Sequence, residues 1–463
     1  MTPVGQGSDV ATPFARLWRS DIRPTLSLGL PLAGAQIAQM GINTTDVLMI
    51  GRLGPEPLAA SVLAFNMWML LWFFGMGIIQ AVIPLGARAR GRRAARELRR
   101  TVRMGLWISV LYCLPAWCLT FFTEEIMIAF GQEPEIAALA GHYMSALQWS
   151  LLPALSIMAL RGFLTVMERS KIVLYATVAG VLVNAVLDYL LIFGAFGFPR
   201  LELLGAGIAS VFTSACTFFI LLAYATSKKG LKRYAILGRI WRSDWQVFFR
   251  ILRLGLPIGF TLVAEGGLFA ASSILMGWIG TLELAAHGIA LQISSITFMV
   301  PVGLSQAALT RVGYAAGRND PAAVGRAGWT ALGITLLFMA CFAVLFWVMP
   351  ETLASFYLDL ADPLSPDVIA LAASFLAVAA IFQIVDGAQI IGLNNLRALG
   401  DTTVPLIYAV IGYWVIGISL SLGIGFAAGV GGVGVWTGLA GGLGFVGVLT
   451  NIRFSKRHAL KLL

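Results

Sequence analysis

Residues 26–54 read LSLGLPLAGAQIAQMGINTTDVLMIGRLG, a stretch that is apolar enough and long enough to cross a membrane as one helix. The stretch also carries Asp46, preceded by the polar side chains of Gln39 and Asn43. A carboxylate inside a bilayer is costly, so it indicates an ion or substrate site. These residues therefore predict a membrane protein whose function depends on polar groups within its spans.

The composition of the whole chain agrees with this prediction. Its 463 residues are 59% hydrophobic and 12% charged, whereas soluble globular proteins carry roughly 25% charged residues. We therefore expect an all-α polytopic membrane protein. The four cysteines lie in apolar segments and the three histidines are scattered, so neither a disulfide framework nor a metal cofactor is expected. No Ser/His or Cys/His constellation indicates catalysis, so the chain is not expected to be an enzyme.

The apolar segments predict twelve transmembrane helices, each near or above the roughly 20 residues that a crossing requires. Several are long enough to be tilted. Their approximate positions are 25–52, 57–87, 101–122, 136–167, 171–196, 205–226, 249–278, 283–311, 325–349, 368–397, 404–426 and 431–453.

The loops between the spans differ in charge. Basic sequences such as RARGRRAARELRR and SKKGLKRYAILGRIWRSD lie on one side, together with both ends of the chain. The other side holds the acidic loop PETLASFYLDLADPLSPD and, of the 32 Lys and Arg, only Arg52 and Arg200. The positive-inside rule then places both termini in the cytoplasm. This distribution, with some binding to anionic lipids, explains the net charge of +10, so no nucleic-acid partner is expected.

An internal repeat relates the two halves of the chain. The sequence LSLGLPLAGAQIAQM from Leu26 aligns without a gap on LRLGLPIGFTLVAEG from Leu252. Each half has six spans, and an even number returns the chain to its starting side, so the halves are parallel repeats that enclose a cavity, as in transporters. The aligned pairs include Gly29 with Gly255, Pro31 with Pro257, Gly77 with Gly303, and Gly91 with Gly317.

This repeat predicts the domain organisation. We expect a cytoplasmic N-terminal segment at 1–24, an N-terminal lobe at 25–226, a cytoplasmic linker at 227–248, a C-terminal lobe at 249–453 and a cytoplasmic tail at 454–463.

The order of these motifs resembles the MATE (multidrug and toxic compound extrusion) family. LGLP opens both halves, and LRALGDTTVPL stands at residues 396–406. The second half retains two acids, Glu265 and Asp386, and in this respect it resembles the NorM branch. The resemblance implies the MATE fold of two pseudo-symmetric six-helix bundles. It also implies a monomeric antiporter of a bacterial inner membrane, which exports lipophilic or cationic compounds in exchange for Na⁺, H⁺ or both, without a cofactor.

Acids within the first half form one expected site. Asn43 and Asp46 share a helix face with Gln39, and Asn184 and Asp188 are spaced i, i+4 on the fifth span. Both spans run outwards, so Asp46 and Asp188 should lie at similar depth. Two carboxylates with an amide oxygen suit Na⁺, and two close carboxylates equally well hold a shared proton.

The family resemblance adds a hydroxyl ligand to this site. The N-terminal cation site of the family resembles Asp46, Asn184 and Asp188 with a hydroxyl from the sixth span. Where the family commonly has Thr, the sequence GAGIAS places Ser210.

Acids of the second half form the other expected site. Glu265 lies on the seventh span and Asp386 on the tenth, flanked at i±3 by Gln383 and Gln389. The C-terminal cation site of the family resembles Glu265 with Asp386, which makes this pair a second candidate for Na⁺. Gln383, Gln389, Gln39 and Asn43 are candidates to line the cavity. No Lys or Arg is expected in the middle of a span to pair with the acids.

Three alternatives remain at this stage. A lipid-linked oligosaccharide flippase of the same superfamily would need basic residues in the cavity for pyrophosphate. A membrane-embedded enzyme would need a catalytic cluster, and a passive channel would not need two lobes. The aromatic residues Trp68, Trp72 and Trp149 are further candidates to line a cavity for aromatic cations.

Overall fold

The computed structural model describes residues 17–359 and 363–462, and these residues form helices and no strand. Eleven helices are long and apolar enough to cross a membrane. They are α3 (Pro55–Gln80) with α4 (Val82–Gly91), α5 (Ala95–Thr120), α7 (Pro134–Leu147) with η2 (Gln148–Ser150) and α8 (Leu151–Val166), α9 (Ser170–Phe193), α10 (Glu202–Ser227), α11 (Trp245–Ile279), α12 (Thr281–Gly317), α13 (Pro321–Val348), α15 (Ser365–Ala398), α16 (Thr403–Val410) with η5 (Ile411–Gly417), α17 (Ile418–Leu422) and η6 (Gly423–Ala427), and α18 (Gly432–Ser455).

Helix α2 (Arg23–Gly51) is the twelfth span, and it is not among the eleven most apolar helices. It carries three amide side chains and a carboxylate, which lower its hydropathy. The remaining described helices are short segments before or between the spans: η1 (Trp18–Ile22), α6 (Thr123–Ala129), η3 (Ala195–Gly197), η4 (Lys232–Tyr234) and α14 (Pro350–Ser355).

Helix ends follow local sequence signals. The carboxylate of Asp244 accepts a hydrogen bond from the Val247 amide at 3.3 Å and caps the start of α11. Asp320 caps α13 in the same way through the Ala323 amide, at 2.9 Å. At the end of α9, Gly194 adopts a left-handed conformation that favours glycine.

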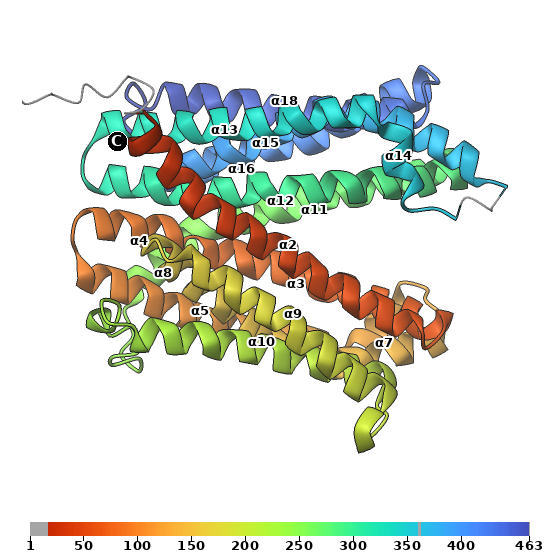
Figure 1. Cartoon of the computed structure of the whole chain (residues 1–463), viewed down its shortest axis with the longest axis horizontal. Helices are drawn as coiled ribbons and strands as arrows, with labels where there is room; N and C mark the ends of the chain where they lie inside the picture. Colours follow the sequence, from red (N-terminus) through yellow and green to blue (C-terminus); the bar gives the residue numbers. More distant parts are fainter. Residues whose placement is uncertain (1–16, 360–362, 463) are drawn as a thin grey trace, which may run out of the picture.

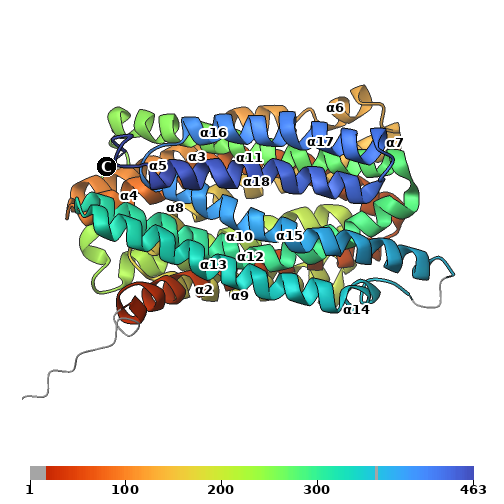
Figure 2. The ribbon, with the colours of Figure 1, turned by 90° about the horizontal axis from the view of Figure 1, so that it is seen from above.

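The helices form two bundles that lie side by side (Figure 1). Helices α2 to α10 make one bundle, here the N-lobe, and α11 to α18 make the other, the C-lobe. The lobes meet where α2 packs against α12 and α3 against α11. Viewed from above, all long helices run roughly parallel to one axis, as helices that span one bilayer must (Figure 2).

The contact between the lobes is built from repeat-related glycines. A Cβ atom added to Gly77 would overlap the backbone of Gly259. One added to its repeat mate Gly303 would overlap the backbone of Ala33, which is the mate of Gly259. Each lobe therefore makes the same close contact with the other, as expected for two repeats related by a pseudo-two-fold axis.

The same reciprocity holds where α4 and α12 end. A Cβ on Gly91 would overlap the carbonyl of Tyr314, and one on Gly317 would overlap the carbonyl of Arg88. Arg88 and Tyr314 are themselves repeat mates. We call this end of the molecule, where α2 begins and α4 and α12 finish, the arginine-rich end. The lobes are in direct backbone contact there.

Candidate ion and substrate sites

Polar side chains from three helices meet within the N-lobe. The Asn184 Nδ2 donates a hydrogen bond to the Asp46 Oδ1 at 3.0 Å, which joins α9 to α2. Asp188, one turn beyond Asn184, is fully buried and interacts electrostatically with Asp46. Ser210 of α10 also interacts with the Asp46 carboxylate. The structure thus brings together all four residues that the sequence and the family resemblance place in this site.

Several oxygens of this N-lobe cluster lack a hydrogen-bond donor. Among the described residues, neither carboxylate oxygen of Asp188 accepts a hydrogen bond, and the Asn184 Oδ1 accepts none either. Buried polar atoms without partners are costly, so these oxygens require a cation or a proton. Oxygen-only donors of this kind fit Na⁺, a hard cation.

A cavity of about 190 Å³ lies beside the cluster and is lined by Asp46, Gln39 and Asn43. Aromatic side chains of α3 also line it. The rings of Phe65 and Trp68 stack at 5.7 Å between centroids, and those of Trp68 and Trp72 at 6.1 Å. A cavity lined by both a carboxylate and stacked rings suits a flat, lipophilic cation.

Arg161 of α8 also lines this cavity. It is 6% exposed and its Nη2 donates to the Gln36 Oε1 at 2.7 Å. The amide oxygen is a neutral partner, so the positive charge of Arg161 is not cancelled by this bond.

A second polar cluster lies within the C-lobe, between α11 and α15. The Gln389 Nε2 donates to the Glu265 Oε1 at 3.3 Å and to the Tyr413 Oη at 2.6 Å. Asp386 is buried and interacts electrostatically with Glu265. Its Oδ1 and the Gln389 Oε1 accept no hydrogen bond from the described residues, so this cluster also holds free oxygen acceptors.

None of the ion pairs among the described residues involves Glu265 or Asp386, but a basic residue near a helix end acts on Glu265. Arg397 is 4% exposed and interacts electrostatically with Glu265. Its Nη1 donates to the Asn394 Oδ1 at 3.2 Å and, across the lobe contact, to the Gln80 Oε1 at 3.3 Å. Arg397 lies one residue before the end of α15, and a long side chain can reach back from a helix end into the bundle.

Two further candidates take positions outside the clusters. Both groups of the Gln383 side chain are hydrogen bonded, at 3.1 Å to the Thr297 hydroxyl and at 3.4 Å to the Met339 carbonyl. Gln383 therefore ties α15 to α12 and α13. The ring of Trp149 packs on Trp117 at 4.7 Å and is 46% exposed, whereas Trp68 and Trp72 line the N-lobe cavity.

Two tyrosines belong to the clusters, and the sequence analysis missed them. Tyr143 of α7 is 2% exposed and interacts electrostatically with Asp46 and Asp188. Tyr413 is fully buried beside Gln389. The hydroxyl of a tyrosine deep within an apolar span needs a hydrogen-bond partner. The positions of Tyr143 and Tyr413 within apolar spans were therefore the sequence signal that they join a polar cluster.

Comparison with known proteins identifies the family. The sequence model of the MatE family matches residues 31–190 and 257–422. The two matches begin at Pro31 and Pro257, which are repeat mates. The chain belongs to the MatE family.

Similar proteins place this MatE chain in the NorM-like branch. It is 44% identical over 452 residues to the probable multidrug resistance protein NorM of Agrobacterium fabrum, covering 98% of this chain and 95% of that protein. It is also 44% identical to the Rhizobium meliloti protein of the same name, covering 95% and 94%.

Solved structures share the MatE fold. A crystal structure of MATE in complex with MaL6 matches with a TM-score of 0.85 at 19% identity, covering 98% of this chain and all of that one. MATE in the straight conformation also gives 0.85, at 20% identity, covering 97% and 99%. This MatE chain is a multi-pass membrane transporter and not an enzyme.

Proposed function

We propose that the chain is a secondary active antiporter that exports lipophilic cations in exchange for Na⁺, H⁺ or both. The observation that carries this proposal is the unpartnered oxygen atoms of Asp188 and Asn184 beside the aromatic cavity. In their unloaded state these oxygens and Asp46 attract a cation. Na⁺ or H⁺ would satisfy them and release a cationic drug, since the two ligands compete for one negative site.

The proposal includes an orientation and a division of the chain. Both termini lie in the cytoplasm of a bacterial inner membrane, and the lobes comprise 25–226 and 249–453, joined by the linker 227–248. The acidic clusters then lie beyond the lobe contact, and the arginine-rich end faces the cytoplasm. Alternating access follows from rocking one lobe against the other. The protein acts as a monomer and needs no cofactor.

The test is efflux from proteoliposomes that contain the purified full-length chain. A fluorescent lipophilic cation is loaded inside, and Na⁺ and pH gradients are imposed separately. Efflux that rises with the Na⁺ gradient or with the pH gradient supports the antiporter and identifies its coupling ion. A flux that is independent of the Na⁺ and pH gradients and depends only on the drug gradient identifies a passive pore and contradicts the proposal.

A second function is favoured by one observation, the buried Arg161 in the N-lobe cavity. A lipid-linked oligosaccharide flippase needs a basic residue for pyrophosphate, and Arg161 is such a residue. The same proteoliposomes distinguish the two, because a flippase moves a fluorescent lipid pyrophosphate between leaflets and leaves the lipophilic cation inside.

A further inference from the structure

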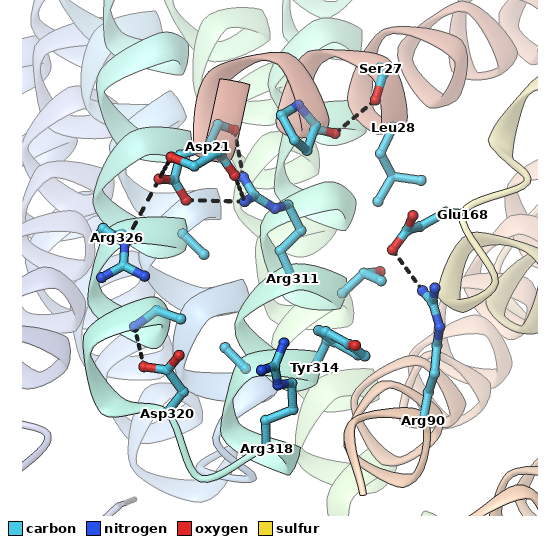
Figure 3. Close-up of a pocket in the computed structure, with 16 residues that line it drawn as sticks. Asp21, Ser27, Leu28, Arg90, Glu168, Arg311, Tyr314, Arg318, Asp320 and Arg326 are labelled. Atoms are coloured by element: carbon cyan, nitrogen blue, oxygen red, sulfur yellow. Dashed lines mark hydrogen bonds and ion pairs between the residues drawn. The ribbon is translucent and has the colours of Figure 1, made fainter. Parts of the chain in front are cut away.

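A polar cavity of about 480 Å³ lies at the arginine-rich end, and Figure 3 shows the residues that line it. One side consists of η1, the start of α2, Arg90 of α4 and Glu168 before α9. The other side consists of α12 and α13. The cavity therefore lies between the two lobes, and no residue of the proposed ion sites lines it.

One wall of the cavity is a closed ion-pair network around Asp21. The Arg311 Nη2 donates to the Asp21 Oδ1 at 3.1 Å and to the Ser20 carbonyl at 2.9 Å. The Arg311 Nη1 donates to the Asp21 carbonyl and to the Thr25 hydroxyl. Both terminal nitrogens of Arg311 are thus used in fastening η1 and the start of α2 in the N-lobe to α12 of the C-lobe.

Three further arginines of the lining keep unused donors. The Arg90 Nη1 donates to the Glu168 Oε1 at 2.8 Å and to the Val166 carbonyl at 2.5 Å, so its Nε and Nη2 remain. Arg90 and Arg318 lie on either side of Tyr314, with guanidinium carbons 5.1 Å and 5.9 Å from the ring centroid (Figure 3). Arg318 makes no ion pair with any described residue. Arg326 reaches Asp21 only through its Nε, at 3.8 Å, which leaves both terminal nitrogens for another acceptor.

The balance of charge on the lining favours an anion. Four arginines face three acids. Of these acids, Asp21 is paired with Arg311, Glu168 is paired with Arg90 at 2.8 Å, and Asp320 caps α13. Capping leaves the negative charge of Asp320 in place, so four arginines against three acids give the lining a net charge of +1. Its unused hydrogen-bond donors are guanidinium N–H groups, which bind phosphate oxygens through charge-assisted hydrogen bonds.

The surroundings of the cavity indicate its depth in the membrane. Leu17 and Trp18, which shortly precede the cavity-lining residues Ser20 and Asp21, are 41% and 42% exposed. Exposed Trp and Leu next to Arg19 and Arg23 are typical of the boundary between headgroups and acyl chains. These residues indicate that the cavity lies at the level of the lipid headgroups.

We propose that this cavity binds a phosphate-bearing anion, such as the headgroup of an anionic phospholipid, through Arg90, Arg318 and Arg326. Basic pockets between transmembrane helices bind such headgroups in other membrane proteins. Because its donors come from both lobes, a bound anion fastens the closed end and stabilises the conformation seen here. Binding itself does not depend on the proposed transport activity.

The experiment measures thermal unfolding of the purified full-length protein in detergent. Short-chain phosphatidylglycerol, phosphatidylcholine of the same chain length, and inorganic phosphate are titrated separately. We expect phosphatidylglycerol to raise the Tm at lower concentration than phosphatidylcholine. The double variant Arg318→Gln/Arg326→Gln should raise the half-saturating concentration roughly tenfold or more, since two charge-assisted hydrogen bonds are lost.

A matched control removes the same charge elsewhere at the arginine-rich end. Arg96→Gln/Arg253→Gln changes two exposed arginines that do not line the cavity. An equal loss in the control pair shows a diffuse basic surface and overturns the proposal, as does equal stabilisation by both lipids. If inorganic phosphate competes with phosphatidylglycerol and depends on the same two arginines, the site is confirmed and its occupant is a soluble phosphate.

Discussion

The two lobes share one scaffold but differ in what they hold. Their contact surface is reciprocal, because Gly77 with Gly259 repeats as Gly303 with Ala33. Their polar clusters are not reciprocal, because the repeat mate of Asp46 is Ser272 and that of Glu265 is Gln39. Backbone contact between the lobes restricts sequence change, whereas the interior of each bundle tolerates it.

The clusters also differ in electrostatics. In the N-lobe, the carboxylates of Asp46 and Asp188 interact with each other, and no described basic residue is among the groups that act on either of them. In the C-lobe, Arg397 lies close enough to Glu265 to interact with it. A cation is therefore more strongly attracted to the N-lobe cluster. The C-lobe cluster is partly compensated and is connected to the lobe contact through Gln80.

The largest expected effect comes from neutralising one acid in each lobe. Asp46→Asn and Glu265→Gln should each reduce ion-driven efflux in everted vesicles to the level of vesicles without the protein, because each removes a charge that the coupling ion must meet. Immunoblots of the membrane fraction control for expression. Full efflux in both variants would remove these acids from the mechanism.

A smaller effect is expected from the arginines that distinguish the lobes. Arg397→Gln should shift the ion concentration for half-maximal efflux by roughly tenfold, about 1.4 kcal/mol, because Glu265 loses its compensating charge. Arg161→Gln should leave this concentration unchanged and alter the KM for the drug, since Arg161 lines the cavity. Identical effects of the two substitutions would contradict the difference between the lobes.

Substitution of either of the reciprocal glycines Gly77 and Gly303 should destabilise the protein by a similar amount. Gly77→Ala and Gly303→Ala should each lower the free energy of unfolding by about 1–3 kcal/mol, because each added methyl group overlaps the facing backbone. Gly333→Ala is the control, since a Cβ there meets nothing within 4 Å. Thermal unfolding in detergent measures all three. A loss confined to one lobe would show that the contact is not symmetric in energy.

The smallest effect is expected at Ser210. Ser210→Ala removes a hydroxyl beside Asp46 and should weaken ion dependence by a few-fold, about 0.5–1.5 kcal/mol. Ser210→Thr keeps the oxygen and should match the unchanged protein. Efflux at graded Na⁺ concentrations measures both variants. A Thr variant as impaired as the Ala variant would exclude the hydroxyl as the relevant group.

Much of this architecture can be predicted from the sequence, because hydropathy locates spans and helical spacing assigns faces. The i, i+4 spacing of Asn184 and Asp188, with the depth of Asp46, anticipates the hydrogen bond between Asn184 and Asp46. The NorM-like family and the transmembrane fold are confirmed by the comparisons.

Other contacts depend on features that spacing does not specify. Arg397 stands at a helix end, where hydropathy assigns it to solvent, and only the packing of α15 shows that its side chain turns inward. Tyr143 and Tyr413 join the clusters through the rotation of α7 and of the irregular helix from α16 to η6. Gln383 shares a face with acids in sequence, yet its amide is used between three helices.

The reciprocal contact between the lobes has a consequence for the origin of the chain. Because the close approaches at Gly77 and Gly91 recur at Gly303 and Gly317 with repeat mates exchanged, this part of the surface would fit between two identical six-helix halves. The linker then joins the two halves covalently but does not create their complementary contact surface. Ala33 faces Gly303, and its repeat mate Gly259 faces Gly77. At this contact the two halves therefore differ by a single methyl group.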